Sequence, residues 1–193
     1  MDDVIRFLLR ARKEMLVKWN RVLPTNELLS DRWEKAKFLG FGEGSSVYDS
    51  SIIIGNVSVG ENVWIGPYTY LDGSGGINIG DGCNVGVGMT ILSKDTRKAI
   101  LSGEAENPLF GTVNIGRACY LGVRSVILPD VSLGDYCVVT AQSVVTQSFP
   151  SRSVIAGNPA KRVGDIRLLG INLNKENAAD ADAQTSREAQ GRT

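Results

Sequence analysis

The sequence predicts a mainly β solenoid, in which short parallel strands wind into a prism with an apolar interior. Three observations support this fold class: an aliphatic residue recurs at every sixth position, glycine often follows it, and the fifth place of each hexad is small. A helix repeats every 3.6 residues and a simple strand every two, so neither explains a sustained period of six. A coil with one short strand and one turn per hexad does explain it.

The hexads run from Val47 to Val145, and two interruptions break the count. Their aliphatic places are Val47, Ile53, Val59, Ile65, Leu71, Ile79, Val85, Ile91, Ile115, Leu121, Ile127, Leu133, Val139 and Val145. Two extra residues lie within Asp72–Asn78, and a longer excursion separates Ile91 from Ile115. Every third hexad returns to the same side, so we expect residues eighteen apart to stack at about 4.8 Å.

The small fifth residues and the glycines of the hexads each have a predicted position in the coil. The small fifth places are Ser51, Val57, Val63, Thr69, Gly75, Cys83, Cys119, Ser125, Val131, Cys137 and Ser143. They should point inward, because the interior of such a coil is narrow. The glycines after the aliphatics are Gly60, Gly66, Gly80, Gly86, Gly116, Gly122 and Gly134. We expect them at corners that need unusual backbone dihedrals.

Composition bounds the class of protein. The chain has 193 residues, enough for one domain with extensions, and its 21 basic residues balance 21 acidic ones. That balance argues against nucleic acid as a partner. No apolar run is long enough for a transmembrane helix and no signal-peptide pattern is present, so a cytoplasmic protein is expected.

Cysteine and histidine usage narrows the chemistry. All three cysteines occupy small inward places, so they are interpreted as packing residues rather than as disulfide or redox partners. The chain contains no histidine, which excludes a histidine-built zinc site, and no metal is expected.

Residues 1–40 are predicted to form an N-terminal helical segment. Residues 1–23 read as a helix that Pro24 ends. Its apolar stripe comprises Val4, Leu8, Ala11, Met15, Trp19 and Val22, and its other faces are basic. One interpretation is peripheral membrane contact through residues 1–23. The other is a helix packed on the coil or on a neighbouring subunit. A second helix is expected from Glu27 to Phe38, with Trp33 inward and Gly40 as its stop.

The remaining boundaries follow from where the hexads lapse. Residues 41–163 are assigned to the coil, with an extruded loop at 96–112. A structureless insertion of this length in a compact solenoid is usually either functional or disordered. The coil ends near Phe149-Pro150. Residues 164–193 form a C-terminal extension, and Asn172–Thr193 is too poor in apolar residues to be expected to fold.

The hexad pattern [LIV]-G-x-x-[STAVC]-x resembles the left-handed parallel β-helix of the hexapeptide-repeat acyltransferases. The handedness comes from this resemblance, since parallel crossovers are otherwise right-handed in about 98% of cases. The likeness covers about Asp31 to Val163. The run Asp31–Ala36 leading into Gly40–Gly44 resembles the entry segment of sugar-acetylating members, and Val154–Val163 resembles the family's terminal strand and coenzyme-binding turn.

The resemblance implies acetyl-CoA as acyl donor, a sugar or nucleotide-sugar hydroxyl or amine as acceptor, and a homotrimer with each active site between two coils. Family members place a histidine just before the excursion, commonly followed by aspartate, and its imidazole accepts the proton of the attacking hydroxyl. Here the run Ile91–Gly103 holds Lys94 at that place, followed by Asp95.

Lysine changes the chemistry. A free lysine has a pKa of about 10.4, so its use as a base requires a large drop through burial or a neighbouring cation. Asp95 would oppose that drop if the two side chains met. Four interpretations stay open: a natural or engineered variant with its base removed, an enzyme whose amine acceptor needs little base while Lys94 holds an anionic group, a lysine base, or a solvated lysine in a protein that only binds.

The resemblance also assigns the donor and acceptor residues. Val123 and Ala141 match places that offer backbone groups to the pantetheine arm, Thr146 and Gln147 lie where the arm bends, and Lys161 and Arg162 match residues that meet the coenzyme phosphates. A separate set of outward-facing residues could face the sugar. It comprises Tyr68, Tyr70 and Asp72.

Two hypotheses of function result. The first is an acetyltransferase of surface-polysaccharide synthesis. The second is a catalytically silent trimer that binds coenzyme or partner proteins in the same grooves. They differ in turnover, because only the transferase should release free thiol from acetyl-CoA.

Overall fold

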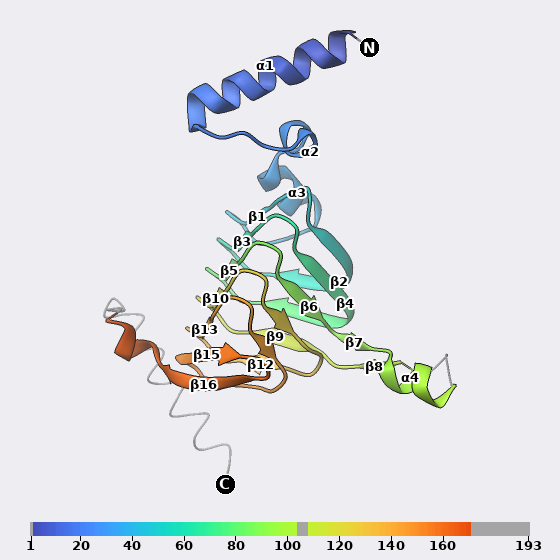
Figure 1. Ribbon diagram of the computed structural model, residues 1–193, viewed down its shortest axis with the longest axis vertical. Coiled ribbons are helices and arrows are strands. Elements are labelled where there is room, and N and C mark those ends of the chain that lie inside the picture. Colours follow the sequence, from blue (N-terminus) through green and yellow to red (C-terminus); the bar gives the residue numbers. More distant parts are fainter. Residues whose placement is uncertain (1, 104–107, 171–193) are drawn as a thin grey trace.

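A computed structural model describes residues 2–103 and 108–170. Three helices, α1 (Asp2–Trp19), α2 (Thr25–Leu29) and α3 (Arg32–Phe38), precede a stack of short strands that forms a tapering coil (Figure 1). The strands of the coil are β1 (Ser46–Val47), β2 (Ile52–Val59), β3 (Trp64–Ile65), β4 (Tyr70–Ile79), β5 (Asn84–Val85), β6 (Thr90–Leu92), β9 (Val113–Ile115), β10 (Tyr120–Leu121), β11 (Val126–Ile127), β12 (Ser132–Leu133), β13 (Val138–Val139), β14 (Val144–Val145) and β15 (Ser153–Gly157). The predicted mainly β solenoid is confirmed.

The strands form three walls. Wall A contains β1, β3, β5, β10, β13 and β15 in that spatial order. The long strands β2 and β4 run across two walls. Their first halves join β6, β11 and β14 in wall B, and their second halves join β9 and β12 in wall C. Each coil therefore contributes one strand segment to each wall, and the coil axis runs along the stack (Figure 1).

The register between coils follows the predicted spacing. Val47 pairs with Ile65 and Leu121 pairs with Val139, in each case eighteen residues on. The two extra residues in β4 lengthen the spacing to twenty, so that Ile65 pairs with Val85. All the predicted inward aliphatics are buried except Ile53, which is only partly buried. It lies on β2, which has a strand neighbour on one side only.

The glycines that follow the aliphatics have a different role from the one expected. None of them has a positive φ. Instead, a Cβ atom on Gly122 would lie 2.5 Å from the backbone nitrogen of Ala141 in the next coil. The left-handed residues come two places later, as at Ala118 (φ +52°) and Arg124 (φ +55°). The expectation of unusual dihedrals at these glycines was therefore wrong, because the close approach of coils is what requires them.

The N-terminal helices differ from the expectation in detail. The second helix is broken, because the Asp31 carboxylate accepts hydrogen bonds from the backbone amides of Trp33 (2.8 Å) and Glu34 (3.1 Å) and so caps a new helix. Trp33 was predicted to point inward, but 52% of its surface is exposed, and Ala36 is the buried residue of α3. Gly40 follows α3 with φ +73°, as a helix stop requires.

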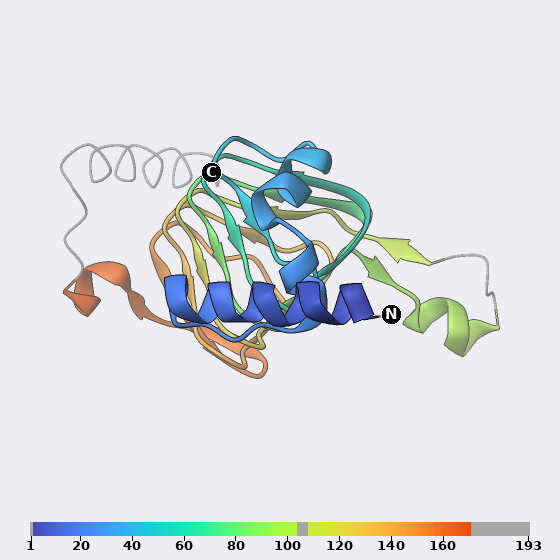
Figure 2. The ribbon, with the colours of Figure 1, turned by 90° about the horizontal axis from the view of Figure 1, so that it is seen from above.

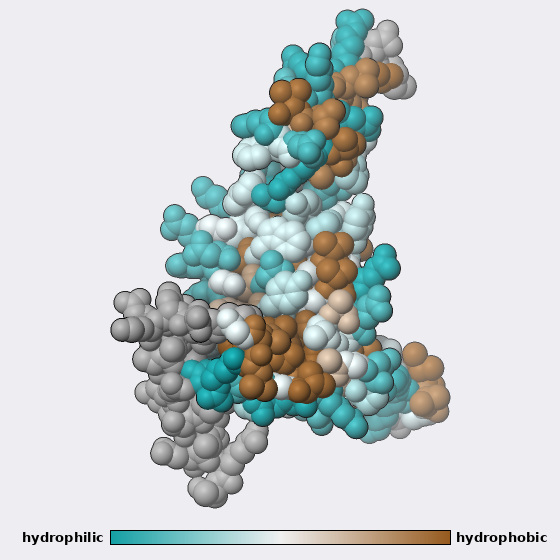
Figure 3. Space-filling model, turned by 60° about the vertical axis from the view of Figure 1, so that its left-hand side comes forward, coloured by the Kyte–Doolittle hydropathy of each residue, from teal (hydrophilic) through white to brown (hydrophobic). Residues whose placement is uncertain are grey.

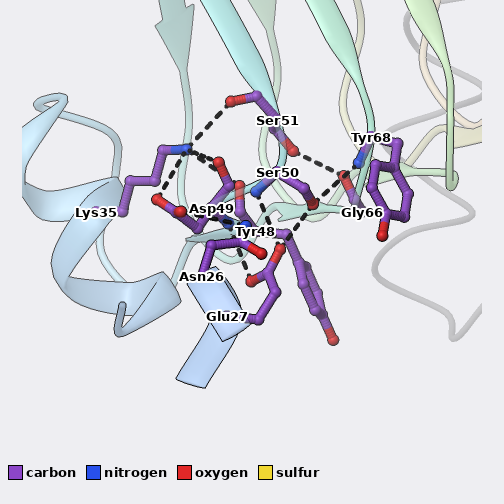
Figure 4. Close-up of polar contacts among 9 residues, drawn as sticks. All are labelled: Asn26, Glu27, Lys35, Tyr48, Asp49, Ser50, Ser51, Gly66 and Tyr68. Carbon is purple, nitrogen blue, oxygen red and sulfur yellow. Dashed lines mark hydrogen bonds and ion pairs between the residues drawn. The ribbon is translucent and has the colours of Figure 1, made fainter. Parts of the chain in front are cut away.

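Two charged side chains attach the helices to the first coil (Figure 4). The buried Glu27 carboxylate accepts hydrogen bonds from the backbone amides of Asp49 (3.1 Å) and Ser50 (3.0 Å). The Lys35 ammonium donates to three backbone carbonyls, those of Tyr48, Asp49 and Ser51, at 2.9–3.2 Å. Helices α2 and α3 are thus held by charge-assisted hydrogen bonds.

The excursion is an ordered arm along most of its length. Strands β7 (Lys94–Asp95) and β8 (Leu109–Phe110) pair antiparallel, and α4 (Arg97–Ser102) lies at the far end. Figure 2 shows the arm projecting away from the coil. The expectation of a structureless loop was wrong for these residues, because β7 and β8 satisfy one another's backbone groups.

The C-terminal part closes the last coil. Strand β16 (Ala160–Asp165) pairs antiparallel with β15, and a short 3₁₀ helix, η1 (Ile166–Leu169), follows. The tail predicted at 172–193 lies outside the described residues. Among the described helices, none combines the length and apolar character needed to cross a bilayer.

The close approach of coils makes one substitution informative. Gly122→Ala should lower the free energy of unfolding by about 1–3 kcal/mol, because its Cβ would meet backbone atoms that cannot move without shifting a coil. Gly164→Ala is the matched control, since its Cβ would lie 3.8 Å from Val154 in ordinary contact. Chemical unfolding of both variants tests this, and equal stabilities would contradict it.

Candidate functional site

The arm leaves the coil at the corner between walls B and C. The buried Ser93 fixes this departure point, because its hydroxyl donates to the backbone carbonyl of Asp72 (2.6 Å) and accepts from the amide of Gly75 (2.7 Å). Its own carbonyl accepts from the amide of Gly111 (2.9 Å), where the arm returns. Lys94 is the next residue, so its place at the corner is set by the coil.

Lys94 is half-buried and faces the returning strand. It pairs with Phe110 across the arm, and its Nζ lies 6.0 Å from the centroid of the Phe110 ring. Within residues 2–103 and 108–170, its ammonium has no hydrogen bond or ion pair. The site therefore contains a cation that the chain's described residues do not neutralise.

Asp95 does not pair with that cation. Its carboxylate binds the Arg97 guanidinium, with a shortest distance of 2.6 Å, and accepts a hydrogen bond from the Arg97 backbone amide (2.9 Å). The hydrogen bonds from the Arg97 side chain, and to a lesser degree the one from its backbone amide, hold the pKa of Asp95 below its usual range. The condition under which Asp95 would act on Lys94, a meeting of the two side chains, is not fulfilled, because the carboxylate binds Arg97.

The predicted acceptor residues are divided between two corners. Asp72 pairs with Leu92 on the next coil, close to the departure of the arm, and its carboxylate accepts from the Ser74 hydroxyl (2.5 Å). Tyr70 begins the same strand. Tyr68 lies at the corner between walls A and B, with φ +60° and 61% of its surface exposed.

The predicted donor residues gather mainly at the corner between walls A and B. Val123 and Ala141 are exposed there on adjacent coils, and the backbone amide of Gln142 donates to the Val123 carbonyl (2.9 Å). The turn of the β15–β16 hairpin follows at this corner, where the Gly157 amide donates to the Ser143 hydroxyl (3.2 Å).

Lys161 and Arg162 leave this turn in different states. The exposed Lys161 pairs with Ala156 across the hairpin, and its ammonium has no polar partner among the described residues. Arg162 donates to the Ser153 hydroxyl (3.1 Å) and to the Asp165 carboxylate (3.2 Å). Only Lys161 therefore presents an uncommitted cation.

One chain does not bring all these residues together. Thr146 and Gln147 are exposed after β14, at the corner of the arm and of Lys94. The strands of wall B, such as β11 (Val126–Ile127), lie between the two corners and hold them apart. Wall B thus has the Lys94 corner at one edge and the Lys161 corner at the other.

Sequence reasoning missed two residues that shape these corners. Ser93 fixes the root of the arm, and its only signal was a small polar residue directly before Lys94. Asp165 accepts a hydrogen bond from Arg162, and it lies outside the hexads, so the repeat pattern gave no signal for it. No group of three or more His, Cys, Asp or Glu side chains in the described part of the chain is arranged to hold a metal ion.

Comparisons with known proteins agree with this architecture. Residues 112–147 match the family model of the bacterial transferase hexapeptide (six repeats), and residues 56–93 match that of the hexapeptide repeat of succinyl-transferase. The carnitine operon protein CaiE of Proteus sp. (strain LE138) is 30% identical over 154 residues, covering 75% of this chain and 77% of that protein. A dTDP-4-amino-4,6-dideoxy-D-glucose acyltransferase of Escherichia coli is 29% identical over 158 residues, covering 66% and 82%.

Solved structures show the same fold. The N-acyltransferase AntD from Bacillus cereus, in complex with dTDP and 3-hydroxybutyryl-CoA, superposes with a TM-score of 0.57 at 20% identity, covering 83% of this chain and 100% of that one. A hexapeptide-repeat containing acetyltransferase of Vibrio cholerae O1 biovar eltor, complexed with acetyl coenzyme A, gives a TM-score of 0.52 at 22% identity, covering 85% and 87%.

The fold and the corner from which an arm emerges define a hexapeptide-repeat β-helix. Together with the relatives, they place the chain in its family. It belongs to the hexapeptide-repeat acyltransferases.

The Asp165 carboxylate, which binds Arg162 and Arg167, predicts how stability depends on pH. Hydrogen bonds and charge from Arg167 lower the pKa of Asp165 to about 2, against about 3.9 in an unfolded chain. Folding is therefore stabilised by about 1–2 kcal/mol above about pH 4, and this contribution is lost as pH falls through about 2.

Arg167→Ala should raise the pKa of Asp165 and remove this contribution. A carboxyl titration followed by NMR measures the pKa, and unfolding at neutral and acidic pH measures the stability. Arg97→Ala is the control, because it should move Asp95 and leave Asp165 in place. An unchanged Asp165 titration in Arg167→Ala would refute the assignment.

Proposed function

We propose that this protein transfers an acyl group, most simply acetyl, from acyl-CoA to the amine of a nucleotide-linked sugar. The observation that carries the proposal is the Lys94 ammonium, which stands at the root of the arm without an anionic partner in the described chain. Two similar proteins support the acceptor class, since one is named as a dTDP-amino-sugar acyltransferase and the other is an N-acyltransferase in complex with dTDP.

Lysine at this place favours an amine over a hydroxyl. A hydroxyl must lose its proton as it attacks, and a protonated Lys94 cannot accept one. A neutral amine attacks the thioester carbonyl directly. The C–N bond forms and the C–S bond breaks, so that CoA leaves as the thiolate. The attacking nitrogen gives up one of its two protons to solvent, and the thiolate takes up one proton from solvent to become the thiol. Lys94 then binds an acceptor anion, such as a nucleotide phosphate, and supplies positioning.

The donor assignment follows the Lys161 corner. The uncommitted Lys161 ammonium and the exposed backbone beside Val123 and Ala141 fit an extended phosphate-bearing substrate such as acyl-CoA. Arg162 fits this role less well, because Ser153 and Asp165 already occupy its guanidinium.

A second copy of the chain would complete the site. The Lys94 corner and the Lys161 corner lie at opposite edges of wall B, and a threefold arrangement would set one copy's Lys94 corner against its neighbour's Lys161 corner. We therefore propose a homotrimer with three shared sites.

The proposed transferase domain comprises residues 41–163, with extensions at residues 1–40 and 164–193. The proposed reaction would serve surface-polysaccharide synthesis in the cytoplasm.

The rival function is a silent trimer that binds coenzyme or a partner without turnover. The absence of histidine from the chain favours it. The transferase requires binding of acetyl-CoA, so calorimetric titration with acetyl-CoA comes first. Failure to bind would remove the transferase and leave a silent trimer that binds a partner.

Release of free thiol from acetyl-CoA then separates the two functions. With amino-sugar nucleotides as acceptors, the native protein should release thiol, and Lys94→Ala should lower the rate about 10- to 100-fold, mainly through weaker acceptor binding. Lys94→His should gain about 10²-fold or more on hydroxyl acceptors.

Lys98→Ala on α4 is the control for loss of a cation on the arm and should leave the rates unchanged. Thiol release from neither the native protein nor Lys94→His, across amine and hydroxyl acceptors, would establish the silent trimer.

Mixed assemblies test the shared site. Lys94→Ala and Lys161→Glu should each be poorly active alone. If two chains form each site, refolding the two variants together should restore activity, because some sites then combine an intact Lys94 with an intact Lys161. Thiol release measures this. Activity that stays at the level of the two separate variants would place both residues in a site within one chain.

A further inference from the structure

Helix α1 stands apart from the coil. It lies across the N-terminal end of the molecule and packs mainly on α2 (Figures 1 and 2). Leu8, Ala11 and Met15, which fall on one side of the helix, are half-buried there. The predicted packing of this helix on the coil is therefore not what the structure has.

Much of the apolar surface of α1 is left uncovered. Ile5, Leu9 and Leu16 are 50%, 58% and 48% exposed, and their spacing of four and seven residues sets them on one stripe. Trp19 at the end of the helix is 57% exposed. Figure 3 shows apolar and hydrophilic residues side by side over this end of the molecule.

The segment that carries this stripe is basic, and Arg6, Arg12 and Lys13 flank the stripe itself. Residues 2–22 hold six basic residues against three acidic ones, a formal charge of +3 in a chain whose net charge is zero. Those basic residues are Arg6, Arg10, Arg12, Lys13, Lys18 and Arg21. Two of the acids form exposed ion pairs, Asp3 with Arg6 (3.7 Å) and Glu14 with Arg10 (3.9 Å).

Other basic residues of the segment keep their charge available. Arg12 donates to the Thr25 hydroxyl (3.3 Å), which leaves its charge unneutralised. Lys13, Lys18 and Arg21 have no acidic partner among the described residues. The Lys18 ammonium lies 5.1 Å from the centroid of the Trp19 ring, so a cation and an aromatic ring lie side by side at the end of the helix.

We propose that α1 binds an anionic membrane surface, lying in the plane of the headgroups with Ile5, Leu9 and Leu16 in the acyl boundary. A helix with an exposed apolar stripe, an aromatic end and a Lys/Arg-rich flank is the form that binds such interfaces. A second copy of the chain fits the stripe less well, because it would have to pair or bury the cations beside it. Anionic headgroups neutralise them in any orientation.

The proposal is independent of the proposed reaction, since no residue of α1 belongs to either corner of wall B.

Vesicle flotation of the full chain tests the proposal. The protein should float with mixed phosphatidylcholine and phosphatidylglycerol vesicles, and salt should weaken this binding. Since each Lys or Arg near an anionic surface contributes about fivefold, Arg12→Gln with Lys13→Gln, on the two sides of the stripe, should lower partitioning about 25-fold. Leu9→Asp with Leu16→Asp should lower it at least about tenfold.

Two matched controls lie on α4, at the far side of the molecule. Lys98→Gln removes an exposed cation and Leu101→Asp replaces a leucine that is 87% exposed, and both should bind vesicles as the native protein does. Absence of flotation, or equal flotation of all variants, would overturn the proposal. If Leu9→Asp with Leu16→Asp instead lowers the oligomeric state of a protein that does not float, the stripe is an interface between copies.

Discussion

The backbone approach between successive coils is the constraint on which the rest of the structure depends. Glycines such as Gly122 have no Cβ that would separate the coils, and the register then stacks the aliphatics into one interior column. The corners inherit their positions from that stacking. The positions of Lys94 and Lys161 are therefore set in part by the spacing of glycines and aliphatics elsewhere in the coil.

Much of this architecture could be predicted from the sequence, because the period of six recurs in every hexad. An irregular hexad therefore does not obscure the pattern that the others share. The column of inward residues and the spacing of eighteen were both correct. The role of the glycines was not, because a one-dimensional pattern does not distinguish a residue that needs a left-handed φ from one that needs space. Only the distance from Gly122 to the next coil decides between them.

The candidate site was harder to predict, because its residues are defined by which corner they occupy and by what already binds them. The sequence placed Asp95 beside Lys94 without showing which group its carboxylate binds. That group is Arg97, at the start of a helix that the hexads do not describe. Likewise Lys161 and Arg162 are neighbours in the chain but differ in state, since Asp165 and Ser153 engage only the second. The prediction that Trp33 points inward was wrong for a related reason. It assumed one helix from Glu27 to Phe38, but Asp31 caps a new helix that begins at Arg32.

The polar cap formed by Glu27 and Lys35 has a consequence for the solenoid as a whole. A stack of parallel strands ends in a row of backbone amides and carbonyls that another stack could extend, and such open ends lead to filaments. Glu27 takes amides of the first coil and Lys35 takes its carbonyls, so these groups offer nothing for a further coil to join. The two side chains thereby terminate the stack at this corner of the first coil.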